Sequence, residues 1–225
     1  MRKDEPLNFE LGDGIYDISE VAFILGLPKA TVRLRMKAFW EGKRRNDHHL
    51  YLRGEGTYSM INFLTLVEFH VFYQLRSLDI STKKIIAAHN TIALQLNTAY
   101  PFASEQVLSE NSLIFSALGD AKLIKDEEEK QTVFNETIGT FFKKLAFSKA
   151  GIADCFYPMG KSKHVVVSPN HQFGQPTIEN TNILAEVVAN LYHAGDSAKV
   201  LSRLYEIPAN VVKDAITFFK PYRTA

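Results

Sequence analysis

The chain has 225 residues, of which 46% are hydrophobic and 23% charged, the balance of a globular protein with one large domain or two to three small ones. Its formal net charge is only +1, which excludes a uniformly basic nucleic-acid binder, so any basic surface has to come from local clustering. The single cysteine, Cys155, excludes a disulfide framework and favours a reducing compartment.

The start of the chain and its most apolar stretch both argue against secretion and membrane insertion. Residues 1–10 are charged and lack the apolar run of a secretory signal. Residues 60–78 are rich in apolar side chains but include Glu68, His70 and Arg76, so we expect a buried helix and not a membrane span. We therefore expect a cytoplasmic protein with no membrane partner.

Residues 19–39 have the pattern of two helices separated by a tight turn. Ser19 is a suitable N-cap for the first helix, and Gly26 suits the left-handed position that commonly ends a helix. Pro28 fits the first turn of the second helix. This order of elements is typical of a helix-turn-helix.

The second of these helices combines an apolar stripe with a basic one. The apolar side chains, which repeat at i, i+4 and i+7 and are expected to face the core, are Val32, Met36 and Phe39. The polar and basic side chains expected to contact DNA are Lys29, Thr31, Arg33, Arg35 and Lys37. Those early in the helix are candidates for base edges, because arginine can form a bidentate pair with guanine.

Residues 40–58 are predicted to form a short β-hairpin, or wing, because glycines flank an alternating apolar and polar stretch. Its basic side chains, expected to contact phosphates, are Lys43, Arg44, Arg45 and Arg53. From Lys29 to Arg53 there are eight lysines and arginines and two acidic residues, a local net charge of +6. A basic helix followed by a basic hairpin predicts a winged helix-turn-helix that places its second helix in the major groove of double-stranded DNA.

The centre of the chain is predicted to begin with two helices and to become less regular. Ser59 and Ser81 are suitable N-caps, and Pro101 interrupts the helical pattern. The predicted elements are helices to about residue 78 and over 82–96, short strands and an acidic loop over 104–131, an amphipathic helix over 133–147 and a connector over 151–163.

The C-terminal part is predicted as a strand, a loop and three helices. The ranges are 165–167 for the strand, 168–181 for the loop, and 182–193, 197–205 and 209–219 for the helices. We therefore predict a mostly α-helical chain with short β-hairpins, in three parts. These are a winged helix-turn-helix with supporting helices over residues 1–100, a middle α/β region over 101–163, and a three-helix, helix-turn-helix-like domain over 164–225.

The stretch "YDISEVAFILGLPKATVRLRMKAF", residues 16–39, resembles the N-terminal helix-turn-helix of MerR-like bacterial regulators. The shared pattern is an apolar or aromatic start, the short helix "EVA..LG", a turn and "TVR". The resemblance implies DNA binding by the first quarter of the chain. The long dimerising helix and the effector cysteines of MerR-like regulators are not evident, which argues against a metal or drug sensor.

The segment from "VVVSPNHQFGQPTIENTNI" to "VLSRLYEIPANVVKDAI" resembles a small bacterial domain of unknown function that occurs at the C-terminus of VapB-like antitoxins. The shared residues are Pro169, Phe173, Gly174, Pro176, Ile178, Thr181, Ile183 and Gly195. The usual Gly-Thr-Arg of that domain is here Asn180-Thr181-Asn182. The resemblance implies a type II antitoxin that neutralises a PIN-like ribonuclease toxin and represses its own promoter.

The charge of this tail favours a protein partner over DNA. From Val165 to Ala225 five basic residues balance five acidic ones, a poor basis for gripping phosphates. Surplus apolar side chains on the last helix suit dimerisation or partner binding, although a closed core also accounts for most of them. The residues expected to contact a partner are Phe173, Arg203, Val212, Ile216, Phe219 and Arg223, of which an arginine could enter an acidic nuclease site.

We expect neither an enzyme nor a metal or other cofactor. The spacings between Cys155, His164 and His171 match no common zinc pattern, and no Ser-His-Asp arrangement is evident. Two alternatives to a homodimeric antitoxin stay open. One is a stand-alone transcription regulator with a ligand-sensing middle region, and the other is an interaction scaffold that does not bind DNA.

Overall fold

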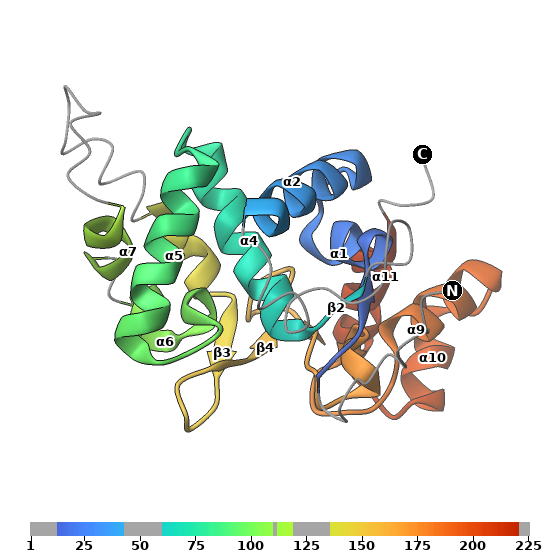
Figure 1. Ribbon diagram of the computed structural model, residues 1–225. Coiled ribbons are helices and arrows are strands. Elements are labelled where there is room, and N and C mark those ends of the chain that lie inside the picture. The colour runs from blue at the N-terminus through green and yellow to red at the C-terminus, as the bar shows by residue number, and fades with distance from the viewer. Residues whose placement is uncertain (1–12, 43–59, 110–111, 119–135, 221–225) are drawn as a thin grey trace, which may run out of the picture.

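The computed structural model describes residues 13–42, 60–109, 112–118 and 136–220 of the chain. Most of these residues are helical, and their strands form three two-stranded antiparallel pairs (Figure 1). The mostly α-helical class with short antiparallel β elements is therefore confirmed. Figure 1 shows the N-terminal helices, in blue, between the green central helices and the orange to red C-terminal ones. Within the described ranges no helix is both long and apolar enough to cross a membrane.

Helices α1 (Ile18–Leu25) and α2 (Lys29–Gly42) are joined by a three-residue turn, as predicted. A capping box starts α1: the carboxylate of Asp17 accepts from the Ser19 and Glu20 amides, and the carboxylate of Glu20 accepts from the Asp17 amide at 2.7 Å. The N-cap is therefore Asp17, and the prediction of Ser19 is wrong by two residues. Gly26 ends α1 with φ 64°, in the predicted left-handed conformation.

Strand β1 (Tyr16–Asp17) pairs with β2 (Met60–Ile61), so the chain that leaves α2 returns beside the start of α1. The predicted wing falls between α2 and β2, and most of it, residues 43–59, lies outside the described residues. Its basic residues also lie outside the described ones, so their contact with DNA stays a prediction; they are Lys43, Arg44, Arg45 and Arg53.

Helices α4 (Phe63–Ser77) and α5 (Thr82–Leu96) confirm the two predicted central helices. Ser81 caps α5, as expected. Helix α4 instead begins after Asn62, whose side chain accepts from the Thr65 amide at 2.8 Å. The predicted cap at Ser59 is wrong, because strand β2 lies between residue 59 and the start of α4.

The middle of the chain is more helical than predicted. Residues 101–103 form a 3₁₀ turn, and two short helices, α6 (Glu105–Ser109) and α7 (Ser112–Ala117), replace the strands expected after residue 104. Val107 and Leu108 of α6 and Ile114 of α7 are buried in the first cluster, so both short helices contribute to the core. The predicted acidic loop, residues 126–129, lies outside the described residues.

Residues 136–142 are helical, within the range predicted. The expected helix nevertheless ends early, because residues 145–147 form β3 (Leu145–Phe147), which pairs with β4 (Ala153–Phe156). The predicted connector over 151–163 therefore contains a strand, whose Ala153 and Phe156 are buried.

The C-terminal strand and the three helices follow the prediction, but the predicted loop over residues 168–181 contains a second strand, β6 (Thr177–Ile178), which was not predicted. Strand β5 (Val165–Val166) pairs with β6, and the three predicted helices are α9 (Ala185–Ala194), α10 (Ala198–Leu204) and α11 (Ala209–Phe219). Between the strands lies the 3₁₀ turn η3 (Gln172–Gly174). We call residues 165–219 the tail.

The buried side chains form two clusters. The first draws on α1, α2, α4, α5, α6, residues 136–142 and the β3–β4 pair. The second lies inside the tail, among β5, β6 and α9 to α11. Phe23 of α1 packs against both clusters, so α1 and the tail meet at this side chain.

A buried polar pair anchors the first cluster. The carboxylate of Glu68, fully buried in α4, lies 2.6 Å from Nε2 of the buried His89 in α5 and accepts from the Phe102 amide at 2.7 Å. One carboxylate thus joins two long helices and the turn that follows them, which satisfies polar groups that are costly to bury alone.

A second polar anchor fastens α11 to the strand side of the tail. Asp214 is buried and accepts from Lys163 Nζ at 3.0 Å, and it lies 2.8 Å from His164 Nδ1. Burial alone would raise the pKa of Asp214, but the hydrogen bonds from His164 and Lys163 outweigh it and the pKa is lowered. The ionised form therefore stabilises the fold.

Replacing Asp214 with asparagine is expected to lower the free energy of unfolding at pH 7 by about 1–2 kcal/mol, since both partners are partly exposed. Because the folded-state pKa of Asp214 is depressed, its contribution is present above the unfolded pKa and is lost as the pH falls below about 4. The free energies of unfolding of the parent and the Asp214→Asn variant, measured with urea, should therefore differ less at pH 3 than at pH 7. Asp196→Asn, at an exposed position, is the control and should leave stability unchanged; an equal effect of the two substitutions would contradict this role.

Candidate functional site: the outer face of α2 and the docked tail

The outer face of α2 carries the predicted cations. Val32 and Met36 are buried in the first cluster, as predicted, and the side chain of Phe39, the third predicted member of this face, lies outside the described ones. Lys29, Arg33 and Lys37 are exposed. Their spacing of four residues keeps them on one side of the helix, so three positive charges point away from the core.

The neighbouring positions on α2 contribute less polar surface than predicted. Thr31 and Arg35 are half-buried. Leu34 is 66% exposed and lies between two of the cations. An exposed leucine next to basic side chains suits a surface that contacts both the polar and the apolar parts of a ligand, such as the methyl group of thymine.

The tail docks on α1 and the residues just before it. The Ile15 amide donates to the Phe173 carbonyl at 3.0 Å, and Gln175 Nε2 donates to Glu20 Oε1 at 2.7 Å. The ring of Phe23 lies 4.9 Å from that of Phe218 and 4.8 Å from that of Phe219. Backbone, polar and aromatic contacts therefore hold α1 against the tail, and sequence analysis did not predict this contact.

One glycine, Gly174, determines how closely the tail approaches Tyr16, the residue at the start of β1. Gly174 has φ +90°, and a Cβ atom there would lie 2.1 Å from the hydroxyl oxygen of Tyr16. Tyr16 is completely buried, and its hydroxyl has no hydrogen-bond partner among the described residues. Burial raises the pKa of this phenol, so Tyr16 is neutral and its ring packs as an apolar group.

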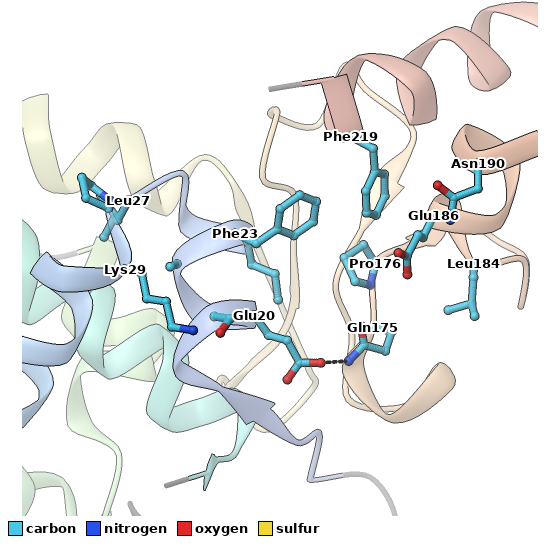
Figure 2. Close-up of a pocket in the computed structure, with 14 residues that line it drawn as sticks. Glu20, Phe23, Leu27, Lys29, Gln175, Pro176, Leu184, Glu186, Asn190 and Phe219 are labelled. Carbon is cyan, nitrogen blue, oxygen red and sulfur yellow. Dashed lines mark hydrogen bonds between the residues drawn. The ribbon is translucent and has the colours of Figure 1, made fainter. Parts of the chain in front are cut away.

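A groove of about 900 Å³ runs between α1, the start of α2 and the tail (Figure 2). Phe23 and Leu27 lie on one wall, and Pro176, Leu184 and Phe219 lie on the other. Glu20, Lys29, Glu186 and Asn190 add polar groups, and Figure 2 shows the hydrogen bond between Glu20 and Gln175 that crosses from one wall to the other.

The predicted partner-binding residues divide into exposed and buried ones. Phe173, 63% exposed, and Arg203 lie on the surface. Val212 is completely buried in the tail cluster, so its side chain is not available to a partner and that prediction is wrong. Ile216 and Phe219 are partly buried against the same cluster. Arg223 lies outside the described residues.

Phe173 is held in an unusual conformation. Its φ is 55° and that of Gln172 is 47°, two consecutive left-handed residues that are not glycine. Such residues cost roughly 1 kcal/mol or more each unless their surroundings fix them. Here Asn182 does so: its Oδ1 lies 2.8 Å from His171 Nδ1, and its carbonyl accepts from Gln172 Nε2 at 3.0 Å.

The departure from Gly-Thr-Arg at residues 180–182 has a structural explanation. Asn180 has φ 59°, and asparagine is, after glycine, the residue that best tolerates this region. Asn182, in place of the arginine, organises the turn that presents Phe173.

Sequence analysis missed several exposed apolar side chains of the tail. These are Val187 and Tyr192 of α9 and Val200 and Leu204 of α10. Val200 and Leu204 are four residues apart and lie on the same side of α10. That spacing is the signal that could have identified them.

The histidines considered for metal binding each contact a different residue and do not form a common site. His164 contacts Asp214, and His171 contacts Asn182. Burial raises the pKa of Cys155, which disfavours the reactive thiolate. In the described part of the chain no three histidine, cysteine or acidic residues are grouped so that they could hold a metal ion.

Comparisons with known proteins show similarity in the tail and in the whole fold. Residues 165–219 match a family described as "Protein of unknown function (DUF433)", and these bounds run from the first residue of β5 to the last of α11. Over its full length the chain is 22% identical to the uncharacterized protein Rv2308 of Mycobacterium tuberculosis, 98% of which is covered. The crystal structure of Rv2018 from Mycobacterium tuberculosis has the same fold, with a TM-score of 0.70 over 96% of this chain and 100% of that one, at 16% identity. The chain thus carries a DUF433-type tail on a fold that a solved structure shares.

Proposed function

We propose that the protein is a cytoplasmic, homodimeric DNA-binding antitoxin that represses its own promoter and neutralises a ribonuclease toxin of the PIN-like class. The observation that carries the DNA-binding part is the outward face of α2. Its exposed cations stand on the second helix of a helix-turn-helix, at a spacing that aligns them. The overall charge is nearly neutral, so this face is a local feature and not a general basicity.

The chemistry of this contact follows from the position of each cation. Lys29 is the first residue of α2, and Arg33 lies one turn further on. The N-terminal part of a recognition helix approaches base edges, whereas later residues meet phosphates, so Arg33 is the candidate for guanine and Lys37 for the backbone. Release of counterions from the phosphates makes such binding strongly dependent on salt.

The toxin-binding part of the proposal rests on the exposed residues of the tail. Phe173 projects from a fixed turn, and an anchor of this kind loses little conformational entropy when it enters a pocket on a partner. Arg203 lies at the end of α10 and can reach an acidic site of a metal-dependent nuclease. Val212 takes no part, since it belongs to the core of the tail.

Replacing Phe173 with serine and Arg203 with glutamate together is expected to weaken binding of the neighbouring-gene product at least tenfold, because an aromatic anchor and a charge are lost at once. The measurement is co-purification followed by titration calorimetry with the purified partner. Leu94→Ser is the control, because Leu94 is an apolar residue on α5 that is even more exposed than Phe173 and lies outside the tail. If the double variant retains its partner as the control does, the tail surface assigned to the toxin is wrong.

A stand-alone regulator is the second candidate, because cavities adjoin the helix-turn-helix. The groove of Figure 2 includes residues of the turn, Leu27 and Pro28. A regulator of this kind would bind promoter DNA without a toxin partner. The co-purification experiment separates the two, since only the antitoxin binds the product of the neighbouring gene.

A further inference from the structure

The outward side of α5 carries no charged side chain over most of its length. Residues 85–104 contain no aspartate, glutamate, lysine or arginine, and this is the longest such stretch in the chain. Burial accounts for only one side of the helix, that of Ile85 and Ile92. The opposite side is exposed from Ala87 to Leu94, where a surface helix normally carries charged residues. A helix face that is exposed and uncharged has the composition of an interface core.

The exposed stripe of α5 combines a large apolar side chain with a small one. Leu94 is 84% exposed, the highest value among the large apolar side chains of the described residues. Ala87 lies two turns earlier on the same side of the helix, and the exposed Asn90 and Thr91 lie between them. The Thr91 hydroxyl donates to the Ala87 carbonyl at 3.0 Å, so it keeps a hydrogen bond when water is removed. The stripe can therefore be buried without leaving an unpaired charge.

The two lysines of α5 lie at the end of the helix that disfavours them. Lys83 and Lys84 are in the first turn, which holds no acidic residue, and the last turn holds no basic one. Cations stabilise the C-terminal end of a helix, where the backbone carbonyls carry partial negative charge, and not the N-terminal end. A second α5 running in the opposite direction would bring these lysines beside the carbonyls of its own last turn. The charge pattern of α5 is thus complementary to that of an antiparallel copy.

We propose that α5 is the surface through which two copies of this chain form an antiparallel dimer with two-fold symmetry. With the two-fold axis between Asn90 and Thr91, at the middle of the stripe, Leu94 of each copy faces Ala87 of the other. A large side chain then packs over a small one at two equivalent places. Figure 1 shows α5 at the opposite end of the molecule from α9 and α10, so this dimer leaves the exposed side chains of those two helices free. The inference rests on the homodimer of the proposed function and names the surface that forms it.

The first test measures the mass of the full-length protein by sedimentation velocity, without DNA or toxin, over about 1–100 μM. One pair of helices is a small interface, so we expect a dimer that dissociates in about the micromolar range. Leu94→Glu should raise the dissociation constant at least tenfold, because it places a charge against Ala87 of the other copy. Leu204→Glu, at an exposed leucine of α10, is the matched control and should leave the dimer unchanged.

The outcomes of this test separate the surface from the rest of the proposed function. A parent that stays monomeric at every concentration overturns the dimer itself. A dimer that Leu94→Glu leaves intact, or that Leu204→Glu weakens as much, overturns only the assignment to α5. Leu94→Ser, the control of the co-purification experiment, should lose the dimer and still bind the toxin, because the two surfaces lie at opposite ends of the molecule.

A mixing experiment tests the antiparallel register. Ala87→Lys alone should also weaken the dimer, since a lysine then meets Leu94 of the other copy. Mixed in equal amounts, the Ala87→Lys and Leu94→Glu proteins should form a heterodimer at least threefold tighter than either variant alone. One of its two sites keeps the parental contact, and the other sets the new carboxylate beside the new ammonium group. Energy transfer between dyes on the two variants measures the heterodimer, and a mixture that associates no better than the separate variants overturns the register.

Discussion

Replacing Arg33 and Lys37 together with alanine is expected to weaken binding of the protein to its own promoter DNA by about 30- to 1000-fold, since each lost contact with a base edge or phosphate costs roughly 1–2 kcal/mol. Both side chains are exposed, and Val32 and Met36 hold α2 to the core from its other side. The double variant should therefore fold normally, and the loss should report on the DNA contact alone.

The dependence of this affinity on salt identifies the kind of contact. The parent should lose affinity steeply as salt rises, and removing two phosphate contacts should reduce the slope of log K against log salt by about 1.8. If Arg33 contacts a base and only Lys37 a phosphate, the slope changes by about half as much while discrimination between sequences decreases. Fluorescence anisotropy with promoter and scrambled duplexes at several salt concentrations measures both quantities.

A matched control removes two positive charges from the tail in place of α2. Lys199 and Lys213 are exposed lysines on α10 and α11 of the tail. Replacing both with alanine changes the net charge equally but should alter specific affinity only slightly. If this control weakens promoter binding as much as the α2 variant, or if the α2 variant binds normally at every salt concentration, DNA recognition by α2 is wrong.

The helices α1 and α2 and the turn between them were predictable because their signals are local. Gly26 and Pro28 mark the turn, and the spacing of Val32 and Met36 marks the buried face. The cap was misplaced because Asp17 and Ser19 are both good N-caps, and only the reciprocal hydrogen bond from the Asp17 amide to the Glu20 carboxylate decides between them. Local sequence patterns therefore predict that these two helices exist, but they do not determine at which residue each helix begins.

The contacts between distant parts were not predictable in the same way. The hydrogen bond between Glu20 and Gln175 joins residues 155 positions apart, and no pattern in either segment indicates the other. For the same reason, His70 and Lys144 come to line one cavity only in the folded chain. The sequence also could not decide the role of Val212, because an apolar residue on a helix suits a core and an interface equally. Its complete burial in the structure assigns it to the core.

Replacing Gly174 with alanine is expected to reduce the free energy of unfolding by about 2–5 kcal/mol, the sum of a left-handed alanine and an overpacked contact. The added Cβ would lie 2.1 Å from the Tyr16 hydroxyl oxygen, 2.6 Å from its ring and 3.2 Å from the backbone of Gly14. None of these atoms can move easily, because Tyr16 is completely buried. Urea unfolding measures the loss.

Gly160→Ala separates the strain of the backbone from the clash. Gly160 has φ +89°, almost the value of Gly174, but a Cβ atom there meets no atom within 4 Å. This control should cost only about 1–2 kcal/mol, the price of the left-handed conformation. If the two substitutions destabilise equally, the close approach of the tail to Tyr16 is wrong.

The Tyr16 hydroxyl allows the clash to be partly relieved. Because that hydroxyl has no partner among the described residues, Tyr16→Phe alone should leave stability unchanged or raise it slightly. Combined with Gly174→Ala, it removes the nearest colliding atom and should recover part of the loss, a coupling that a double-mutant cycle measures directly. Hydrogen exchange should locate the same effect in α1 and α11, where Phe23 meets Phe218 and Phe219, because a tail that no longer fits against Tyr16 loosens these rings first. The position of the tail on α1 thus depends on the absence of one side chain at residue 174, and the cycle tests that dependence without reference to any ligand.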